Sequence, residues 1–235
     1  MKILAINSSP KGKKSTTYFM VENFLKGAKE IGAETEHILL SEKKIHHCIG
    51  CFVCWTKTPG ICVFDDDMKE LLKKDSDILV FASPLYFDNI SGLMKNFMDR
   101  CIPQALPFVE KDCNGEARHV LKKKKRPKLV VISNSGFPEQ SHFIVLKTLF
   151  KRIARNMHTK VIAEIYRSEG PLLLTKDKRQ EPIIEKYKML LQKAGREISQ
   201  NLTLSDQTQQ DLEKPLIPYD LYLKSMNEHF NQLLS

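Results

Sequence analysis

The strongest constraint on the fold is an alternation of short apolar runs with amphipathic segments along most of the chain. A strand that is apolar along its whole length is typical of a sheet buried on both faces, and parallel neighbours need a helix in the crossover between them. The pattern therefore predicts a doubly wound α/β fold with a five-stranded parallel sheet. The expected strands are residues 2–6, 34–40, 78–82, 129–133 and 161–166, and the expected helices are 17–29, 65–74, 91–100, 141–156 and 181–200.

The length of 235 residues fits one generous α/β domain with an extension, and it requires no second full domain. We expect residues 1–200 to form that domain, with a polar, lysine-rich insertion at 102–126 outside the minimal sheet. Residues 201–235 form a C-terminal extension in which Pro215 and Pro218 precede a helical end. Both extra segments are expected to contact partners or other subunits.

Three loops gather where strands of such a sheet end, which is where doubly wound folds bind their ligands. The first, Ser8–Thr17, is rich in hydroxyls and leads into a helix, whose unpaired N-terminal amides suit a phosphate. It has neither the spacing of a Walker A loop nor a G-x-G-x-x-G fingerprint. Ordinary helix capping remains the alternative explanation for Ser15 and Thr16.

The other two loops, Ser83–Asn89 and Asn134–Phe137, carry aromatic residues at the same edge. Tyr86, Phe87 and Phe137 could flank a flat aromatic ligand, which backbone amides would also contact. Each ring taken singly is more often part of a core or of the surface. Their common position at the strand ends favours a binding site with a phosphate at one end and a ring at the other.

Four of the six cysteines fall in one short segment, at positions 48, 51, 54 and 62. Thiolates at such close spacing can hold a 4Fe–4S cluster. Zinc also accepts four thiolates, although its sites more often pair two separated knuckles. Buried, reduced cysteines without any metal are the third interpretation.

The net charge of +9 includes a basic run at residues 122–126. This run has no interleaved aromatic residues and no recognisable DNA- or RNA-reading motif, so we expect a solvated loop and no nucleic-acid partner. The first residues are too short an apolar run for a signal peptide, and no stretch is long enough to span a membrane. We therefore expect a cytoplasmic protein without a membrane partner, in which the thiols stay reduced.

The loops and cysteines together resemble the flavodoxin-like NADPH-dependent FMN reductase superfamily, and specifically its iron-sulfur flavoprotein branch. The resemblance rests on Asn7–Lys11 before Ser15, on the cysteine motif followed by Asp66-Asp67-Met68, on Ser83–Gly92 and on Asn134–Pro138. It implies a flavodoxin-like sheet of order 2-1-3-4-5, bound FMN and a homodimer or homotetramer. The implied cofactor-binding residues are Ser8, Ser9, Lys11, Ser15, Thr16 and Thr17 around the phosphate, Pro84, Leu85, Tyr86, Phe87 and Asn89 along the isoalloxazine, and Asn134, Ser135, Gly136 and Phe137 on its pyrimidine side; the implied metal ligands are Cys48, Cys51, Cys54 and Cys62.

The expected function is that of an FMN-dependent oxidoreductase, coupled to a 4Fe–4S cluster if the cysteines hold one. Its redox partner would be a ferredoxin-like protein or NAD(P)H, and the scheme requires no catalytic acid or base. One alternative is a cluster-free NAD(P)H-dependent FMN, quinone or nitroaromatic reductase. The other is a flavodoxin-like electron carrier with no substrate of its own, although flavodoxins are usually acidic.

Overall fold

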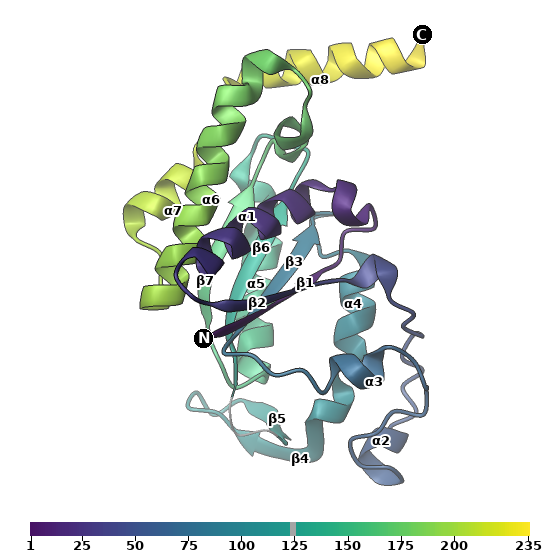
Figure 1. Ribbon diagram of the computed structural model, residues 1–235. Coiled ribbons are helices and arrows are strands. Elements are labelled where there is room, and N and C mark those ends of the chain that lie inside the picture. The colour runs from purple at the N-terminus through teal and green to yellow at the C-terminus, as the bar shows by residue number, and fades with distance from the viewer. Residues whose placement is uncertain (123–125) are drawn as a thin grey trace.

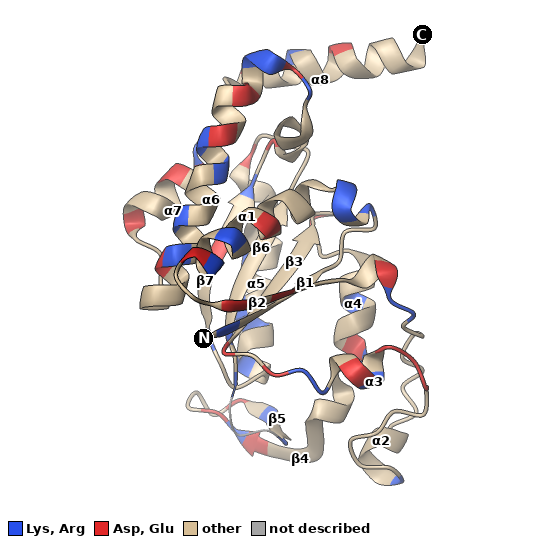
Figure 2. Cartoon of the chain, viewed as in Figure 1, with Lys and Arg blue, Asp and Glu red and all other residues tan. Residues whose placement is uncertain are grey.

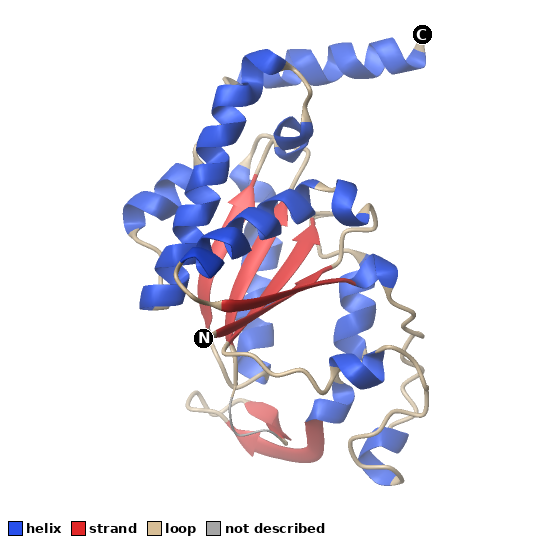
Figure 3. Cartoon of the chain, viewed as in Figure 1, coloured by secondary structure: helices blue, strands red, loops and turns tan. Residues whose placement is uncertain are grey.

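A five-stranded parallel sheet forms the centre of the computed structural model, which describes residues 1–122 and 126–235 (Figures 1 and 3). The strand order is β2-β1-β3-β6-β7, with all neighbours parallel. Because β6 and β7 are the fourth and fifth strands of this sheet, the predicted order 2-1-3-4-5 is confirmed. The strands are β1 (Lys2–Asn7), β2 (Glu34–Leu39), β3 (Ile78–Pro84), β6 (Lys128–Asn134) and β7 (Val161–Arg167).

Helices cover both faces of the sheet (Figure 1). Successive side chains of a strand point to opposite faces, so Ile3 and Ala5 enter one apolar core while Leu4 and Ile6 enter the other. The first face is covered by α1 (Thr16–Glu30), α6 (Glu181–Asn201) and α7 (Asp206–Glu213), and the second by α3 (Met68–Leu71), α4 (Gly92–Asp99) and α5 (Ile144–Asn156). Charged residues of both signs alternate along α6, whose apolar stripe faces α1 (Figure 2).

Two glycines allow α1 and α6 to approach closely. A Cβ atom at Gly27 would lie 1.9 Å from the carbonyl oxygen of Gln192, and one at Gly195 would lie 1.9 Å from that of Phe24. Real Cβ atoms never come so near a backbone atom, so any larger residue would push the helices apart. This close contact holds α1 against α6.

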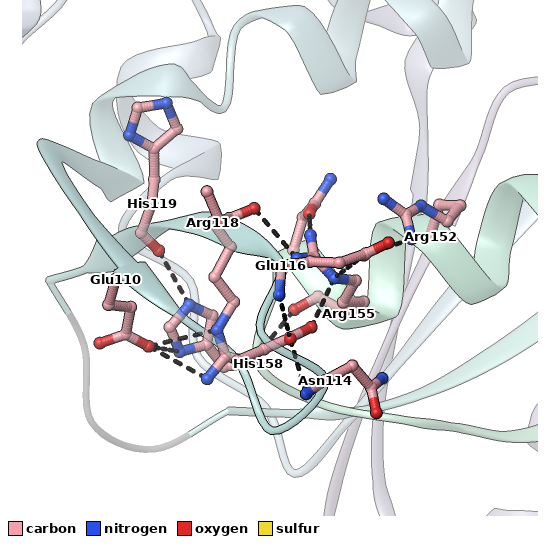
Figure 4. A network of polar contacts seen from close by, with 11 residues as sticks. Glu110, Asn114, Glu116, Arg118, His119, Arg152, Arg155 and His158 are labelled. Carbon is pink, nitrogen blue, oxygen red and sulfur yellow. Dashed lines mark hydrogen bonds and ion pairs between the residues drawn. The ribbon is translucent and has the colours of Figure 1, made fainter.

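The insertion at 102–126 contains a β-hairpin that the sequence analysis did not anticipate, made of β4 (Ala105–Lys111) and β5 (Ala117–Leu121). It is fastened to the end of α5, as Figure 4 shows. Arg155 Nε donates to Asp112 at 2.7 Å and lies 2.9 Å from Glu116, and His158 Nε2 lies 2.8 Å from the carbonyl oxygen of His119. The hairpin is therefore docked on the second face of the domain near the amino ends of the strands.

The remaining differences from expectation are local. The helix expected at 65–74 is confined to Met68–Leu71, because the Asp66 carboxylate turns inward and accepts hydrogen bonds from distant groups. A short helix, α2 (Val53–Thr56), lies within the cysteine segment. The basic run at 122–126 is described only at Lys122 and Arg126, since residues 123–125 lie outside the described part of the chain.

The C-terminal extension ends in α8 (Tyr219–Leu234), which begins beyond the carboxyl ends of the strands and whose last turns extend away from the other elements (Figure 1). Tyr222 is its one buried residue. Within the described residues, no helix has both the length and the apolar character that crossing a membrane requires.

Candidate flavin and iron-sulfur site

The three predicted loops meet at the carboxyl ends of β1, β3 and β6. Asn7 pairs with Ala82 and Pro84 with Asn134 in the strand register, so the loops start side by side. Backbone bonds continue this pairing into the loops, from Ser8 to the Ala82 carbonyl at 2.8 Å and from Leu85 to the Asn134 carbonyl at 2.9 Å. The structure therefore brings the three segments together, as the sequence analysis expected.

Ser8 lies inside the protein, and its hydroxyl is already engaged. It is fully buried, donates to the Ala82 carbonyl at 3.2 Å and accepts from Ser91 Oγ at 2.8 Å. Ser91 is also the N-cap of α4, where its side chain accepts from the Met94 amide. Ser8 thus holds the first loop against the second. The two hydroxyls in contact, those of Ser8 and Ser91, are 83 residues apart in the sequence.

The hydroxyls at the start of α1 are engaged as well. Ser15 caps the helix by accepting from the Tyr18 amide at 3.0 Å, and it donates to the Gly12 carbonyl at 2.7 Å. Thr16 Oγ1 donates to the Gly170 carbonyl, and Thr17 Oγ1 accepts from Asn134 Nδ2 at 2.8 Å. These contacts fix the geometry of the helix end, and the alternative explanation of Ser15, ordinary helix capping, is present in the structure.

Backbone amides at this helix end are available to an anion. In the ranges 1–122 and 126–235, the amides of Thr16 and Thr17 have no acceptor. They point along the axis of a 15-residue helix, whose dipole favours negative charge there. Lys11 is exposed close by and has no ion pair in the described residues, and Ser9 is buried with its amide bonded to Asn7 Oδ1. The first loop therefore fits a phosphate through amides more than through hydroxyls.

Exposed aromatic rings stand on the other two loops. Phe87 is fully exposed, and Tyr86 and Phe137 are each about half exposed. A tight turn presents Phe87, because Tyr86 and Asn89 exchange two backbone hydrogen bonds of 3.0 Å around it. Phe87 and Asp88 have φ values of 50° and 53° there, a conformation that costs residues with a Cβ some strain and that often marks a functional turn.

The second and third loops are joined beneath these rings. Phe137 stacks on His142, with ring centroids 4.6 Å apart, and His142 Nδ1 lies 3.1 Å from Asp88 Oδ1. The third loop is also held from behind, since the Ser135 amide donates to the Arg167 carbonyl and Tyr222 Oη donates to the Gly136 carbonyl. The chemistry of this edge, with free helix amides at one end and exposed rings at the other, fits FMN.

The four cysteines of the 48–62 segment line one small cavity of about 20 Å³. Cys54 is buried, Cys48 and Cys62 are partly buried, and Cys51 is exposed. Burial raises the pKa of the Cys54 thiol, and the nearby charges of Cys62, Cys51 and Cys48 raise it further. Apolar residues such as Phe52 and Phe64 complete the wall.

The donor set fits a cluster better than a single ion. Among the described residues, no three His, Cys, Asp or Glu side chains surround one metal ion. In a 4Fe–4S centre each iron takes one thiolate, so the four sulfurs stand around a body larger than an ion. Thiols that share a cavity without converging on one point are consistent with that arrangement.

A buried ion pair, absent from the sequence prediction, lies beside this cavity and contributes Arg100 to its wall. The side chains of Arg100 and Asp66 are 1% and 3% exposed, and two hydrogen bonds of 2.7 and 3.0 Å join them. Arg100 also donates to the His46 carbonyl at 2.7 Å, and its guanidinium lies over the Phe64 ring. Its buried Nε has no hydrogen-bond partner in the described residues. No local sequence signal marks this residue, because its partner is 34 positions away.

The cysteine segment leaves and returns to the domain through a narrow neck. The Lys44 amide donates to Asp67 Oδ2 at 2.7 Å, and the Asp67 amide donates back to the Lys44 carbonyl at 3.2 Å. One step further out, the His46 amide donates to Asp66 Oδ2 at 2.9 Å. The segment is thus a closed loop whose two ends are bonded to each other.

Comparison with known proteins agrees with this geometry. The sequence model of a family described as NADPH-dependent FMN reductase matches residues 1–122. An iron-sulfur flavoprotein of Methanocaldococcus jannaschii is 39% identical over 110 residues, which are 46% of this chain and 55% of that protein. An iron-sulfur flavoprotein of Archaeoglobus fulgidus is 37% identical over 142 residues, 60% of this chain and 58% of that protein. The chain therefore spans little more than half the length of these relatives.

Solved structures with the same fold are more distant in sequence. An NAD(P)H:quinone oxidoreductase from Methanothermobacter marburgensis has a TM-score of 0.61 at 14% identity, with 86% of this chain and 98% of that chain covered. An FMN-dependent NADH-azoreductase from Bacillus anthracis, solved with FMN, has a TM-score of 0.59 at 18% identity, with 84% and 99% covered. At these identities, the likeness shows the common fold alone.

Proposed function

The chain belongs to the NADPH-dependent FMN reductase family, and from that premise we propose that it is an FMN-dependent oxidoreductase in which four cysteines hold a 4Fe–4S cluster coupled to the flavin. The observation that carries the cluster is the single cavity lined by Cys48, Cys51, Cys54 and Cys62. Bound FMN supplies transfer of one or two electrons, and a bound cluster supplies transfer of one. The name that the relatives share, iron-sulfur flavoprotein, supports the same assignment.

The first loop binds the phosphate of the flavin in this proposal. The free amides of Thr16 and Thr17 donate to it, Lys11 contributes positive charge, and Ser9 lines the loop. The side chains of Ser8, Ser15 and Thr17 hold the loop in shape through their bonds to Ser91, Gly12 and Asn134.

The second and third loops hold the ring system. Pro84, Leu85, Tyr86, Phe87 and Asn89 lie along the isoalloxazine, and their exposed rings keep water from one side of it. The backbone of Asn134, Ser135, Gly136 and Phe137 faces its pyrimidine side. The bonds of this third loop to Arg167 and Tyr222 keep its amides oriented while the charge on the ring changes.

Arg100 acts on the cluster as a positioning residue. Its guanidinium places a fixed positive charge beside the four thiolates, and its unpartnered Nε can donate a hydrogen bond to a sulfur atom. Asp66 keeps the guanidinium oriented toward the cavity. Hydrogen bonds to sulfur and nearby charge are among the main determinants of the reduction potential of such clusters.

The experiment that tests the proposal is anaerobic purification followed by a visible spectrum and iron and sulfide analysis. We expect flavin bands together with about four irons per chain, the content of one 4Fe–4S centre. Cys54→Ala should lose the iron and keep the flavin, whereas the matched control Cys113→Ala, in the exposed hairpin turn, should keep both. No flavin after addition of FMN would overturn the central proposal.

A second candidate is a cluster-free NAD(P)H-dependent reductase. It is favoured by the exposed position of Cys51 and by the small volume, about 20 Å³, of the cavity among the four thiols. Flavin without iron in the wild-type protein, with steady-state oxidation of NAD(P)H, would identify it. Flavin and iron without any NAD(P)H oxidation would instead favour an electron carrier that serves a ferredoxin-like partner.

The net charge and the free thiols support a choice of redox partner and of cell compartment. A net charge of +9 suits an acidic partner such as a ferredoxin-like protein, or the anionic NAD(P)H, because long-range attraction accelerates their encounter. All six cysteines are free, which supports a location in the reducing cytoplasm. The Lys122–Arg126 run has no assigned role in this scheme.

We also propose that α8 joins copies of the chain into a homodimer or homotetramer. Leu223, Met226, Phe230 and Leu233 follow the alternating spacing of three and four residues that packs one helix against another. Three of them are exposed, and the outer turns of α8 are largely uncharged (Figure 2). Light scattering of the Phe230→Ser, Leu233→Ser double variant should report the monomer, and an unchanged mass would contradict this role.

A further inference from the structure

A cavity lined by twenty-two described residues lies at the opposite edge of the sheet from the three loops. Its volume is about 790 Å³, within the range of small-molecule sites in proteins. It opens at the amino ends of three strands, beside Lys2 of β1, Asp77 before β3 and Pro127 before β6. The flavin loops begin where these same strands end, so neither FMN nor the cysteines occupy this space.

The interior of the cavity is apolar. Leu4, Ile6, Leu79 and Phe81 form its floor on the second face of the sheet. Its side walls come from the last turns of α4 and α5 and contain Phe97, Met98, Ile153 and Met157. Water finds few hydrogen-bond partners in such a space, whereas a ligand with an apolar body would bury a large apolar area there.

The hairpin completes the outer wall and is held firmly in place. Ala105 and Leu121, at the base of β4 and β5, both line the cavity. The ion pairs of Arg155 with Asp112 and Glu116 fasten the hairpin to α5, next to the wall residues Ile153 and Met157 (Figure 4). The sheet, the ends of α4 and α5 and the base of the hairpin therefore form the floor and walls of the cavity.

The charged groups at the rim are paired, with one exception. Lys2 lies 3.4 Å from Glu34, Lys74 lies 2.6 Å from Glu36, and Gln104 donates to the Leu72 carbonyl. Asp75 and Asp77 also have partners. Arg126 lines the cavity and has no ion pair or hydrogen bond within the described residues. Burial lowers the pKa of its guanidinium, and no neighbouring carboxylate offsets that cost.

We propose that this cavity binds a small amphipathic anion, an apolar body with one carboxylate or similar group, whose charge pairs with Arg126. The apolar floor and walls select the body, and the lone guanidinium at the rim selects the anionic end. The inference does not depend on the flavin or the cluster, because Met98, Cys101 and Gln104 face this cavity while Arg100, Ile102 and Pro103 face the thiols.

The methionines of the cavity provide a direct test. The full chain, with FMN present, is labelled with methyl-¹³C methionine and titrated with octanoate. The signals of Met98 and Met157 should shift and saturate, while those of Met20, buried on the other face, and Met189, exposed on α6, should not. Equal shifts at all four, or none at Met98 and Met157, would overturn the proposal. So would Met98 and Met157 signals that change with protein concentration alone, which would mean that a second copy covers the cavity.

Substitution of Arg126 tests separately how the cavity binds the anionic group and the apolar body of the ligand. Arg126→Gln should weaken octanoate binding about tenfold, the loss of roughly 1.4 kcal/mol expected for a charge-assisted pair, and should leave neutral octan-1-ol unaffected. Arg179→Gln, which removes an exposed arginine elsewhere on the surface, should affect neither ligand. Met157→Trp, which fills the cavity, should weaken both, and the dichroism spectrum would show that it is folded. An octanoate affinity that is unchanged in both Arg126→Gln and Met157→Trp would overturn the proposal.

Discussion

Two hydrogen bonds join the guanidinium of Arg100 to the buried Asp66 carboxylate, and Arg100 also lines the four-cysteine cavity. Burial works against the charge on Asp66, but hydrogen bonds from Arg100 and from the His46 and Met68 amides, with the charge of Arg100, hold the pKa of Asp66 below its usual range. Burial likewise disfavours the charge on Arg100, and contact with Asp66 and Cys62 outweighs it and raises the pKa of Arg100.

Asp66→Asn should destabilise the metal-free protein by about 3–5 kcal/mol, because it leaves a charged arginine buried without its partner. Urea unfolding measures this. The matched control is Glu70→Gln, which breaks a solvent-exposed pair with Lys73 and should leave stability nearly unchanged. Similar losses of stability in both variants would show that the buried pair stabilises the protein no more than an exposed pair does.

The stability difference between wild type and Asp66→Asn should depend on pH. Since the folded state lowers the pKa of Asp66, the contribution is complete above the ordinary aspartate pKa of about 4 and is lost as the pH falls through the folded-state value. Unfolding curves between neutral and acidic pH should therefore converge at the acidic end. Curves that stay parallel would mean that Asp66 is not ionised in the folded protein.

Phe87→Ala should weaken FMN binding about 3- to 10-fold without lowering the melting temperature. The ring is fully exposed, so its loss removes no core contact, while contact between aromatic rings contributes about 0.5–1.5 kcal/mol. Fluorescence titration with FMN measures the affinity. Phe108→Ala, which removes an exposed ring from the distant hairpin, is the control and should bind FMN as the wild type does.

Gly195→Ala should destabilise the domain by about 1–3 kcal/mol, the usual cost of overpacking, because its Cβ would meet the Phe24 carbonyl. Gly92→Ala is the opposite case. A Cβ there meets nothing within 4 Å, and alanine favours the helix, so stability should stay the same or rise by up to about 1 kcal/mol. Thermal unfolding of the two variants and the wild type would show whether Gly195→Ala lowers the stability and Gly92→Ala does not.

Tyr222→Phe should cost about 1 kcal/mol at neutral pH, since the Gly136 carbonyl loses its hydroxyl donor. Burial, helped by the charge of Glu169, raises the pKa of Tyr222 to about 12. For an acid whose folded-state pKa is raised, the contribution is complete below the ordinary tyrosine value near 10 and disappears as the pH rises toward 12. Melting temperatures of the two proteins should therefore approach each other between pH 10 and 12.

The sheet was predictable because its signal is local. The strand expected at 78–82 is apolar throughout and that at 129–133 is apolar except for Ser133, and the structure extends them by only a few residues to Ile78–Pro84 and Lys128–Asn134. The grouping of the thiols was predictable for the same reason, since Cys48, Cys51 and Cys54 are neighbours in the chain. Periodicity and spacing carry such information without any knowledge of distant contacts.

The contacts that depend on distant partners were not predictable. Nothing near Arg100 indicates that it pairs with Asp66, and nothing near Ser8 indicates that Ser91 will bury its hydroxyl. The hairpin is a different case. Asn114-Gly115 is a strong hairpin signal between the runs at 105–111 and 117–121, but the polar composition of the insertion obscured it.

The hydrogen bonds between Lys44 and Asp67 close the cysteine segment into a separate structural unit. Its two ends are bonded to each other, and no strand of the central sheet passes through it, so a short turn could replace it without altering the register of β1, β2 or β3. Closing a loop of a different length changes the free energy only slowly with length. A lineage could therefore gain or lose this segment in one insertion or deletion, and an engineer could graft it onto a related sheet.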